Sequence, residues 1–153
     1  MSHVIDVQSL TKDYGKSRGI FDLTFQVEPG EIFGFLGPNG AGKTTTIRHL
    51  MGFIRPDRGQ ASILGMDCFS QAAAIQAHVG YLPGELSLMD DLTGDGFLRF
   101  MARMRGMPDL GCAEELKELF RLDGRQSLRK MSKGTRQKVG LICTFMARPD
   151  LPG

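Results

Sequence analysis

The sequence predicts an α/β fold, in which a phosphate-loop core carries an antiparallel β subdomain and a helical insertion. The apolar run at residues 32–36 precedes a glycine-rich loop, and residues 44–51 then carry apolar side chains in helical spacing. Residues 21–27 instead alternate apolar and polar side chains, which is typical of an antiparallel strand with one face in water. Residues 86–147 show helical spacing. A buried strand, an antiparallel sheet and a helical unit are therefore expected in one chain.

The remaining elements follow from the same periodicities and from turn residues. Thr93 is a candidate N-cap for the first helix of the helical unit. The expected strands lie near residues 4–7, 61–64 and 79–83, and the expected helices near 70–78, 93–105, 112–120 and 132–147.

Residues 37–45 match the phosphate-loop pattern G-x-x-x-x-G-K-[ST], with an apolar run before them and a helix after them. Its glycines let backbone N–H groups face phosphate oxygens at the positive end of the following helix. Lys43 is expected to reach the β- and γ-phosphates of a nucleotide, and the Thr44 hydroxyl to ligate Mg²⁺. A glycine-rich turn that binds nothing is the alternative, which the strand, loop and helix order disfavours. The expected phosphate-binding residues are Gly37, Pro38, Asn39, Gly40, Ala41, Gly42, Lys43, Thr44 and Thr45.

Length and composition fit an ordinary domain of 153 residues with one hydrophobic core. The net charge of +2 argues against a broad nucleic-acid surface. Cys68, Cys112 and Cys143 are odd in number and lack C-x-x-C spacing, so we expect buried, reduced thiols of a cytosolic protein. No window is apolar enough to span a membrane, and the N-terminus has no signal-peptide pattern. Any membrane crossing would be left to another polypeptide.

A second motif, Met-Ser-Lys-Gly-Thr-Arg-Gln-Lys, occupies residues 131–138. With it the chain resembles the ATP-binding subunit of an ABC transporter, a family whose signature is L-S-G-G-Q. Ser132 and Gly134 match the serine and the second glycine of that signature. The departures are similar to the S-K-G-M-[KR]-Q form of multidrug and antibiotic exporter subunits. The order of aromatic residue, phosphate loop, helical insertion and signature also follows the family.

The resemblance implies ATP and Mg²⁺ as cofactors, with Tyr14 stacked on adenine. It implies that Ser132 and Gly134 contact ATP held by a second ATP-binding subunit in a head-to-tail dimer. It also implies a transmembrane permease partner, no nucleic-acid partner, and a cytoplasmic location on the inner face of the membrane. Taken alone, residues 132–138 equally fit a plain N-capped helix with a basic face, and Tyr14 fits a simple turn aromatic.

By the same resemblance, residues 1–85 form the phosphate-loop core with its antiparallel β subdomain. Residues 86–147 form the helical subdomain ending in the signature helix, and residues 148–153 form the truncated start of the Walker B region. Gly84 stands where the family has a glutamine that senses Mg²⁺, and Glu85 is the nearest side chain that could replace it. The chain ends before the family's Mg²⁺-binding aspartate and catalytic glutamate. Because phosphoryl transfer depends on metal placement and an oriented nucleophile, we expect ATP binding without hydrolysis and no catalytic residue.

Four alternatives stay open at this point. The basic residues between Arg121 and Lys138 suggest nucleic acid, although no aromatic side chain is interleaved among them. A soluble, non-transport ABC protein acting on ribosomes or DNA would need a second cassette or coiled-coil arms. A small phosphate-loop kinase would have no use for the signature helix. A non-functional, truncated gene product fits the sequence as well, and no residue specifies a transported substrate.

Overall fold

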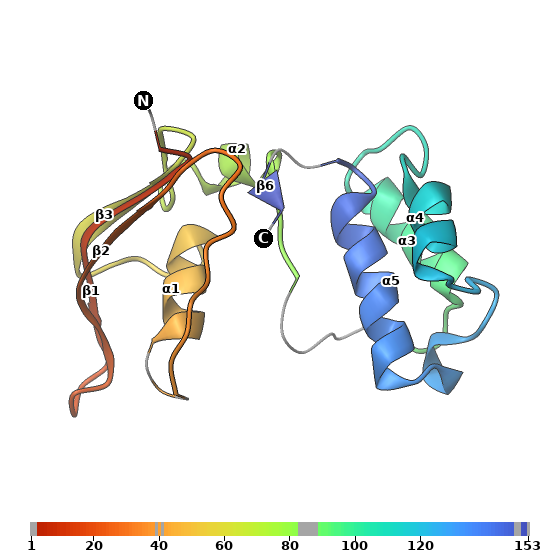
Figure 1. Cartoon of the computed structure of the whole chain (residues 1–153), viewed down its shortest axis with the longest axis horizontal. Coiled ribbons are helices and arrows are strands. Elements are labelled where there is room, and N and C mark those ends of the chain that lie inside the picture. The colour runs from red at the N-terminus through yellow and green to blue at the C-terminus, as the bar shows by residue number, and fades with distance from the viewer. Residues whose placement is uncertain (1–2, 39, 41, 83–88, 149–150, 153) are drawn as a thin grey trace. The chain divides into compact units, whose positions relative to one another are not determined.

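A computed structural model describes residues 3–38, 40, 42–82, 89–148 and 151–152 of the chain (Figure 1). The chain forms two units, Met1–Ala77 and His78–Gly153. The first contains an antiparallel sheet and the helix that follows the phosphate loop, and the second is mostly helical. The boundary expected after residue 85 falls within residues 83–88, outside the described residues, and stays a prediction.

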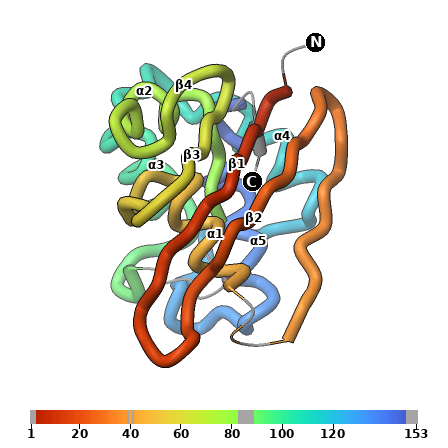
Figure 2. Tube along the Cα trace, turned by 90° about the vertical axis from the view of Figure 1, so that its left-hand side faces the viewer, coloured from red at the N-terminus to blue at the C-terminus, as the bar shows by residue number. Residues whose placement is uncertain are grey.

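The first unit is built on a four-stranded antiparallel sheet with the order β2-β1-β3-β4, in which β1 and β2 lie side by side as a long hairpin (Figure 2). Val7 on β1 is fully buried and pairs with Phe25 of β2 and Ala61 of β3. The antiparallel pairing expected for residues 21–27 is thus confirmed. The strands are β1 (Ile5–Asp13), β2 (Gly19–Val27), β3 (Arg58–Ile63) and β4 (Met66–Asp67).

Helix α1 (Lys43–Leu50) packs against β2 and β3, and a short helix α2 (Ala72–Gln76) follows β4. The buried side chains of α1 are Thr46, His49 and Leu50. The His49 Nδ1 lies 2.7 Å from the Thr45 carbonyl oxygen and donates to it, which leaves Nε2 without a partner among the described groups. Burial of polar side chains on this helix is tolerable because Thr46 and His49 each bond to a carbonyl one turn earlier.

The strand expected at residues 32–36 does not form, which corrects the sequence prediction. Ile32 is 99% exposed and Leu36 94% exposed, although a central strand would bury both. A parallel strand is held by ladders to its neighbours, and no described strand lies against this segment. Phe33 and Phe35 instead pack on Phe25 of β2, with ring centroids 5.1 and 5.2 Å from it.

The second unit contains the helices expected from the sequence. Thr93 caps α3 by accepting a hydrogen bond from Gly96 N–H at 3.0 Å, as predicted. Of the strand expected at 79–83, Val79–Gly80 forms β5, which pairs in parallel with β6 (Leu151–Pro152), residues 81–82 are irregular, and residue 83 lies outside the described residues. The helices are α3 (Gly94–Met104), α4 (Ala113–Phe120), the 3₁₀ turn η1 (Leu128–Lys130) and α5 (Lys133–Phe145).

One apolar cluster holds α3, α4 and α5 together. The cluster consists of Phe97, Leu98, Ala102, Ala113, Leu122, Leu128, Met131, Val139, Ile142, Cys143 and Met146.

The three cysteines of the chain are free and buried, as expected. Burial raises the pKa of the Cys68 thiol, in the first unit, to about 12.

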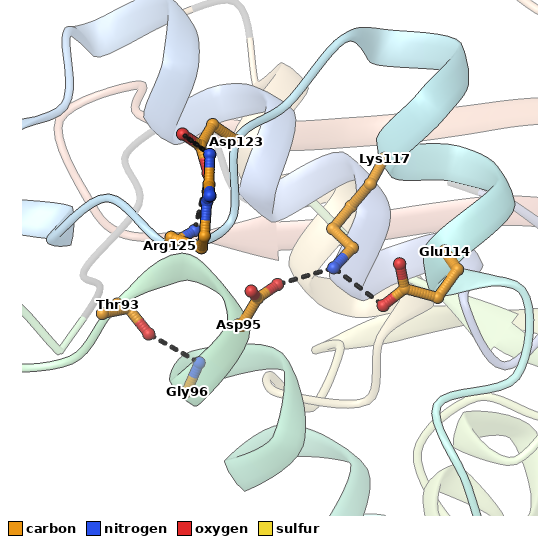
Figure 3. A network of polar contacts seen from close by, with 7 residues as sticks. All are labelled: Thr93, Asp95, Gly96, Glu114, Lys117, Asp123 and Arg125. Carbon is orange, nitrogen blue, oxygen red and sulfur yellow. Dashed lines mark hydrogen bonds and ion pairs between the residues drawn. The ribbon is translucent and has the colours of Figure 1, made fainter.

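A polar network ties α3 to α4 at the edge of this cluster (Figure 3). The Lys117 ammonium lies 2.7 Å from a carboxylate oxygen of Asp95 and 2.7 Å from one of Glu114. Burial disfavours the charge of Lys117, but hydrogen bonds to the two carboxylates outweigh it and raise the pKa of the amine. A Cβ atom on Gly124 would lie 2.0 Å from Asp95 Oδ1, so glycine at 124 makes room for this pair.

We expect Ile142→Ala to lower the free energy of unfolding of the second unit by about 3 kcal/mol, because it removes a fully buried side chain and leaves a cavity. Leu119→Ala is the matched control, since Leu119 is 72% exposed, and we expect it to cost less than about 0.5 kcal/mol. Urea unfolding followed by circular dichroism measures both. Similar losses for the two variants would contradict the assigned core.

Candidate nucleotide site

A pocket of about 400 Å³ lies in the first unit, between the turn joining β1 to β2 and the start of α1. Its volume falls in the range of small-molecule and cofactor pockets. The described lining residues include two cations and no carboxylate, so the pocket favours an anion. They are Tyr14, Arg18, Gly19, Gly40, Gly42, Lys43, Thr44 and Thr45.

The end of the phosphate loop is shaped by backbone conformations that only glycine adopts freely. Gly40 and Gly42 have φ of 88° and 92°, and Gly42 is the N-cap of α1. A Cβ atom on Gly42 would lie 2.3 Å from the Ile20 side chain. The first N–H groups of α1 have no intrahelical acceptor, and the positive end of the helix dipole lies there. The loop therefore presents backbone donors and positive potential at the pocket.

Lys43 and Thr44 supply the side chains of this part of the pocket. The Lys43 ammonium donates to the carbonyl of Gly37, so the two ends of the loop are joined. Thr44 offers one hydroxyl oxygen, the type of ligand that Mg²⁺ takes when phosphates and water complete its coordination. Among the residues that the structure describes, no group of three or more His, Cys, Asp or Glu side chains is placed to hold a metal ion.

The turn at residues 14–18, called the Tyr14 turn below, forms the opposite side of the pocket. Tyr14 is 53% exposed, and its backbone N–H donates to the Arg18 carbonyl at 2.9 Å. Asp57 anchors the two residues before Tyr14, because its carboxylate accepts from Asp13 N–H at 2.9 Å and from the Lys12 ammonium at 3.0 Å. These bonds, the Asp13 one foremost, lower the pKa of the Asp57 carboxyl. An exposed aromatic face at a fixed place is suited to stacking.

Sequence reasoning missed Arg18 and Gly19, which also line the pocket. They lie at the junction of a turn and a strand, outside any motif. The available signal was an arginine four residues after the candidate stacking tyrosine, in a turn with three further polar or glycine positions.

The structure brings Tyr14, Gly40, Gly42 and the first residues of α1 together, whereas Gly37 and Pro38 are exposed and do not line the pocket. Gly37 contributes only the carbonyl held by Lys43. The predicted site residues Asn39 and Ala41 lie outside the described residues, as do Gly84 and Glu85.

Ser132 and Gly134 lie at the N-terminus of α5 in the second unit. The Ser132 hydroxyl oxygen accepts from Thr135 N–H at 3.2 Å and lies 2.9 Å from the Thr135 hydroxyl. Arg136 donates to Asp90 at 2.7 Å and to the Leu128 carbonyl at 3.0 Å, which fixes the first turn of the helix. This is the geometry of a capped helix, and the nucleotide role of the two residues stays a prediction.

Comparisons with known proteins agree with this arrangement. The chain matches a solved "Structure of ATP binding subunit of ABC transporter" with a TM-score of 0.81 and 31% identity, covering 97% of this chain and 64% of that one. The fold is therefore that of a phosphate-loop nucleotide-binding domain. A family model described as ABC transporter matches residues 20–152, so the chain belongs to the ABC transporter family. The resemblance drawn from residues 37–45 and 131–138 is confirmed.

Two of the similar proteins have names that refer to multidrug and bacitracin transport. The chain is 35% identical to the probable multidrug ABC transporter ATP-binding protein YbhF of Escherichia coli, covering 97% of this chain and 26% of that protein. It is 34% identical to the bacitracin transport ATP-binding protein BcrA of Bacillus licheniformis, covering 99% and 50%. The chain thus spans a quarter to a half of the length of these relatives. No described helix is long and apolar enough to cross a membrane.

We expect Gly42→Ala to destabilise the first unit by more than about 2 kcal/mol, because the new methyl group meets Ile20 and φ is positive. Gly40→Ala is the matched comparison: its φ is equally positive, but nothing lies within 4 Å of the new atom, so only about 1 kcal/mol is expected. Urea unfolding measures both, and equal losses would show that Gly42 is not packed against β2.

Proposed function

We propose that this chain is the ATP-binding part of an exporter-type ABC transporter ATPase. The observation that carries the proposal is the composition of the pocket. It contains two cations, backbone N–H donors of a loop with glycines at positive φ, an exposed tyrosine and no described carboxylate. A nucleoside triphosphate combines the anionic and aromatic groups that such a pocket suits. Family membership supports the same conclusion.

Each part of the pocket has a role in this proposal. Tyr14 stacks on adenine, and the loop N–H groups and Lys43 hold the phosphates. The Lys43 ammonium has three N–H donors, so it can keep its bond to the Gly37 carbonyl and still pair with the β- and γ-phosphates. The Thr44 hydroxyl is the side chain that would hold Mg²⁺, which neutralises phosphate charge when bound.

Ser132 and Gly134 belong to a second, opposing site in this proposal. An α-helix of 13 residues starts immediately after Ser132, so its positive end and free N–H groups suit the phosphate of a nucleotide held by another subunit. Two chains would then close head to tail over two ATP molecules and act on a transmembrane permease. The chain would lie at the cytoplasmic face of the membrane through that permease.

We further propose that these 153 residues bind ATP without hydrolysing it. Attack on the γ-phosphate requires a side chain that orients the nucleophile, and carboxylates and glutamines are the residues that serve. None lines the pocket among the residues that the structure describes. Binding and turnover are therefore separable in this chain.

Lys43→Ala is expected to weaken ATP binding at least tenfold, because it removes a charge-assisted contact worth about 1.5–3 kcal/mol. Lys130→Ala is the control, since it removes the same charge from an exposed position in the second unit. Isothermal titration calorimetry gives both dissociation constants. Equal affinities in the two variants would contradict the assigned phosphate site.

The chain with saturating ATP and Mg²⁺ is expected to release inorganic phosphate no faster than ATP in buffer. A coupled phosphate assay measures this, with calorimetry on the same sample to establish that ATP is bound. Phosphate release that is abolished by Lys43→Ala would refute the separation of binding from turnover.

A further inference from the structure

Arg18 lines the pocket but has no role in the family pattern drawn from the sequence. Its side chain is exposed, and its guanidinium forms no ion pair or hydrogen bond with a described residue. A solvated surface arginine is the ordinary explanation of such a residue. The location of Arg18 favours a role in ligand binding, because it is one of only two cations among the described lining residues.

The backbone fixes where Arg18 lies in the pocket. Its carbonyl accepts from Tyr14 N–H at 2.9 Å, and its own N–H donates to the Gly15 carbonyl at 3.1 Å. The next residue, Gly19, has its carbonyl oxygen 3.3 Å from where a Cβ atom on Gly42 would lie. Arg18 therefore lies between the Tyr14 turn and the end of the phosphate loop.

We propose that Arg18 binds the α-phosphate of the nucleotide. This inference rests on the proposed ATP binding, with Tyr14 at the base and Lys43 at the β- and γ-phosphates. The α-phosphate joins these two ends of the molecule, and Arg18 joins the two parts of the pocket that hold them. A guanidinium presents a planar fork of donors that matches phosphate oxygens, and here no described carboxylate competes for it.

The test compares Arg18→Gln with Lys16→Gln. Both residues lie in the same turn and both substitutions remove one positive charge, but Lys16 does not line the pocket. We expect Arg18→Gln to weaken ATP and ADP binding alike by about tenfold, which corresponds to about 1.4 kcal/mol. Lys16→Gln is expected to change the dissociation constant for either nucleotide by less than about twofold, since an exposed charge is screened by salt. Arg18→Lys keeps the charge without the planar fork of donors, so we expect its dissociation constants to lie between those of Arg18→Gln and of the unchanged chain.

Calorimetry with ATP and with ADP separates the outcomes. Equal effects of Arg18→Gln and Lys16→Gln would overturn the contact. An effect of Arg18→Gln on ATP but not on ADP would overturn its assignment to the α-phosphate, because that phosphate is present in both nucleotides. Lys43→Ala is measured in parallel. If Lys43→Ala weakens ATP binding and Arg18→Gln does not, only the role of Arg18 fails. If the unchanged chain does not bind ATP, the proposed function fails and the Arg18 contact with it.

Discussion

The packing of Gly42 against β2 determines where the phosphate loop lies. Ile20 is buried in the sheet, and its side chain occupies the space that any Cβ at residue 42 would need. The start of α1 is therefore set by the sheet and not by the loop itself. Because Gly19 and Arg18 directly precede Ile20, the same packing brings the β1–β2 turn to the end of the loop. The two sides of the pocket are thus positioned by one close contact.

Hydrogen bonds of the Asp57 carboxylate complete this arrangement on the tyrosine side. Asp57 precedes β3 and reaches back to Lys12 and Asp13 at the end of β1. The turn is closed by its own hydrogen bonds between Tyr14, Gly15 and Arg18, and Asp57 ties the end of β1 before it to the start of β3. The pocket is accordingly formed by residues whose backbone positions are fixed and whose functional side chains are largely exposed.

Much of this fold was predictable, because its signals are local. The alternation over residues 21–27, the Thr93 cap and the helical spacing before Ala147 each specify an element without help from distant residues. The absence of a strand at residues 32–36 was not predictable in this way, since an apolar run becomes a strand only where neighbouring strands pair with it. Phe33 and Phe35 find a partner in Phe25 instead, whereas Ile32 and Leu36 find none among the described residues.

The site shows the same division. Gly40, Gly42 and Lys43 were recognisable because a loop that binds phosphate needs these residue types at this spacing. Arg18 was not, because its place in the pocket depends on the packing of Ile20 and on the hydrogen bonds of its own turn. A motif identifies residues that act through the chain near them, and it misses those that act across the fold.

The hydrogen bond from Lys43 to Gly37 has a consequence for nucleotide affinity. The Lys43 ammonium carries three N–H donors, and this carbonyl occupies one of them, so two remain for phosphate oxygens. The bond holds a long, flexible side chain across the loop, so binding a phosphate costs less of its rotational freedom. Two remaining donors on a cation held in place suit a ligand with oxygens on neighbouring phosphates, which favours polyphosphates over singly charged anions.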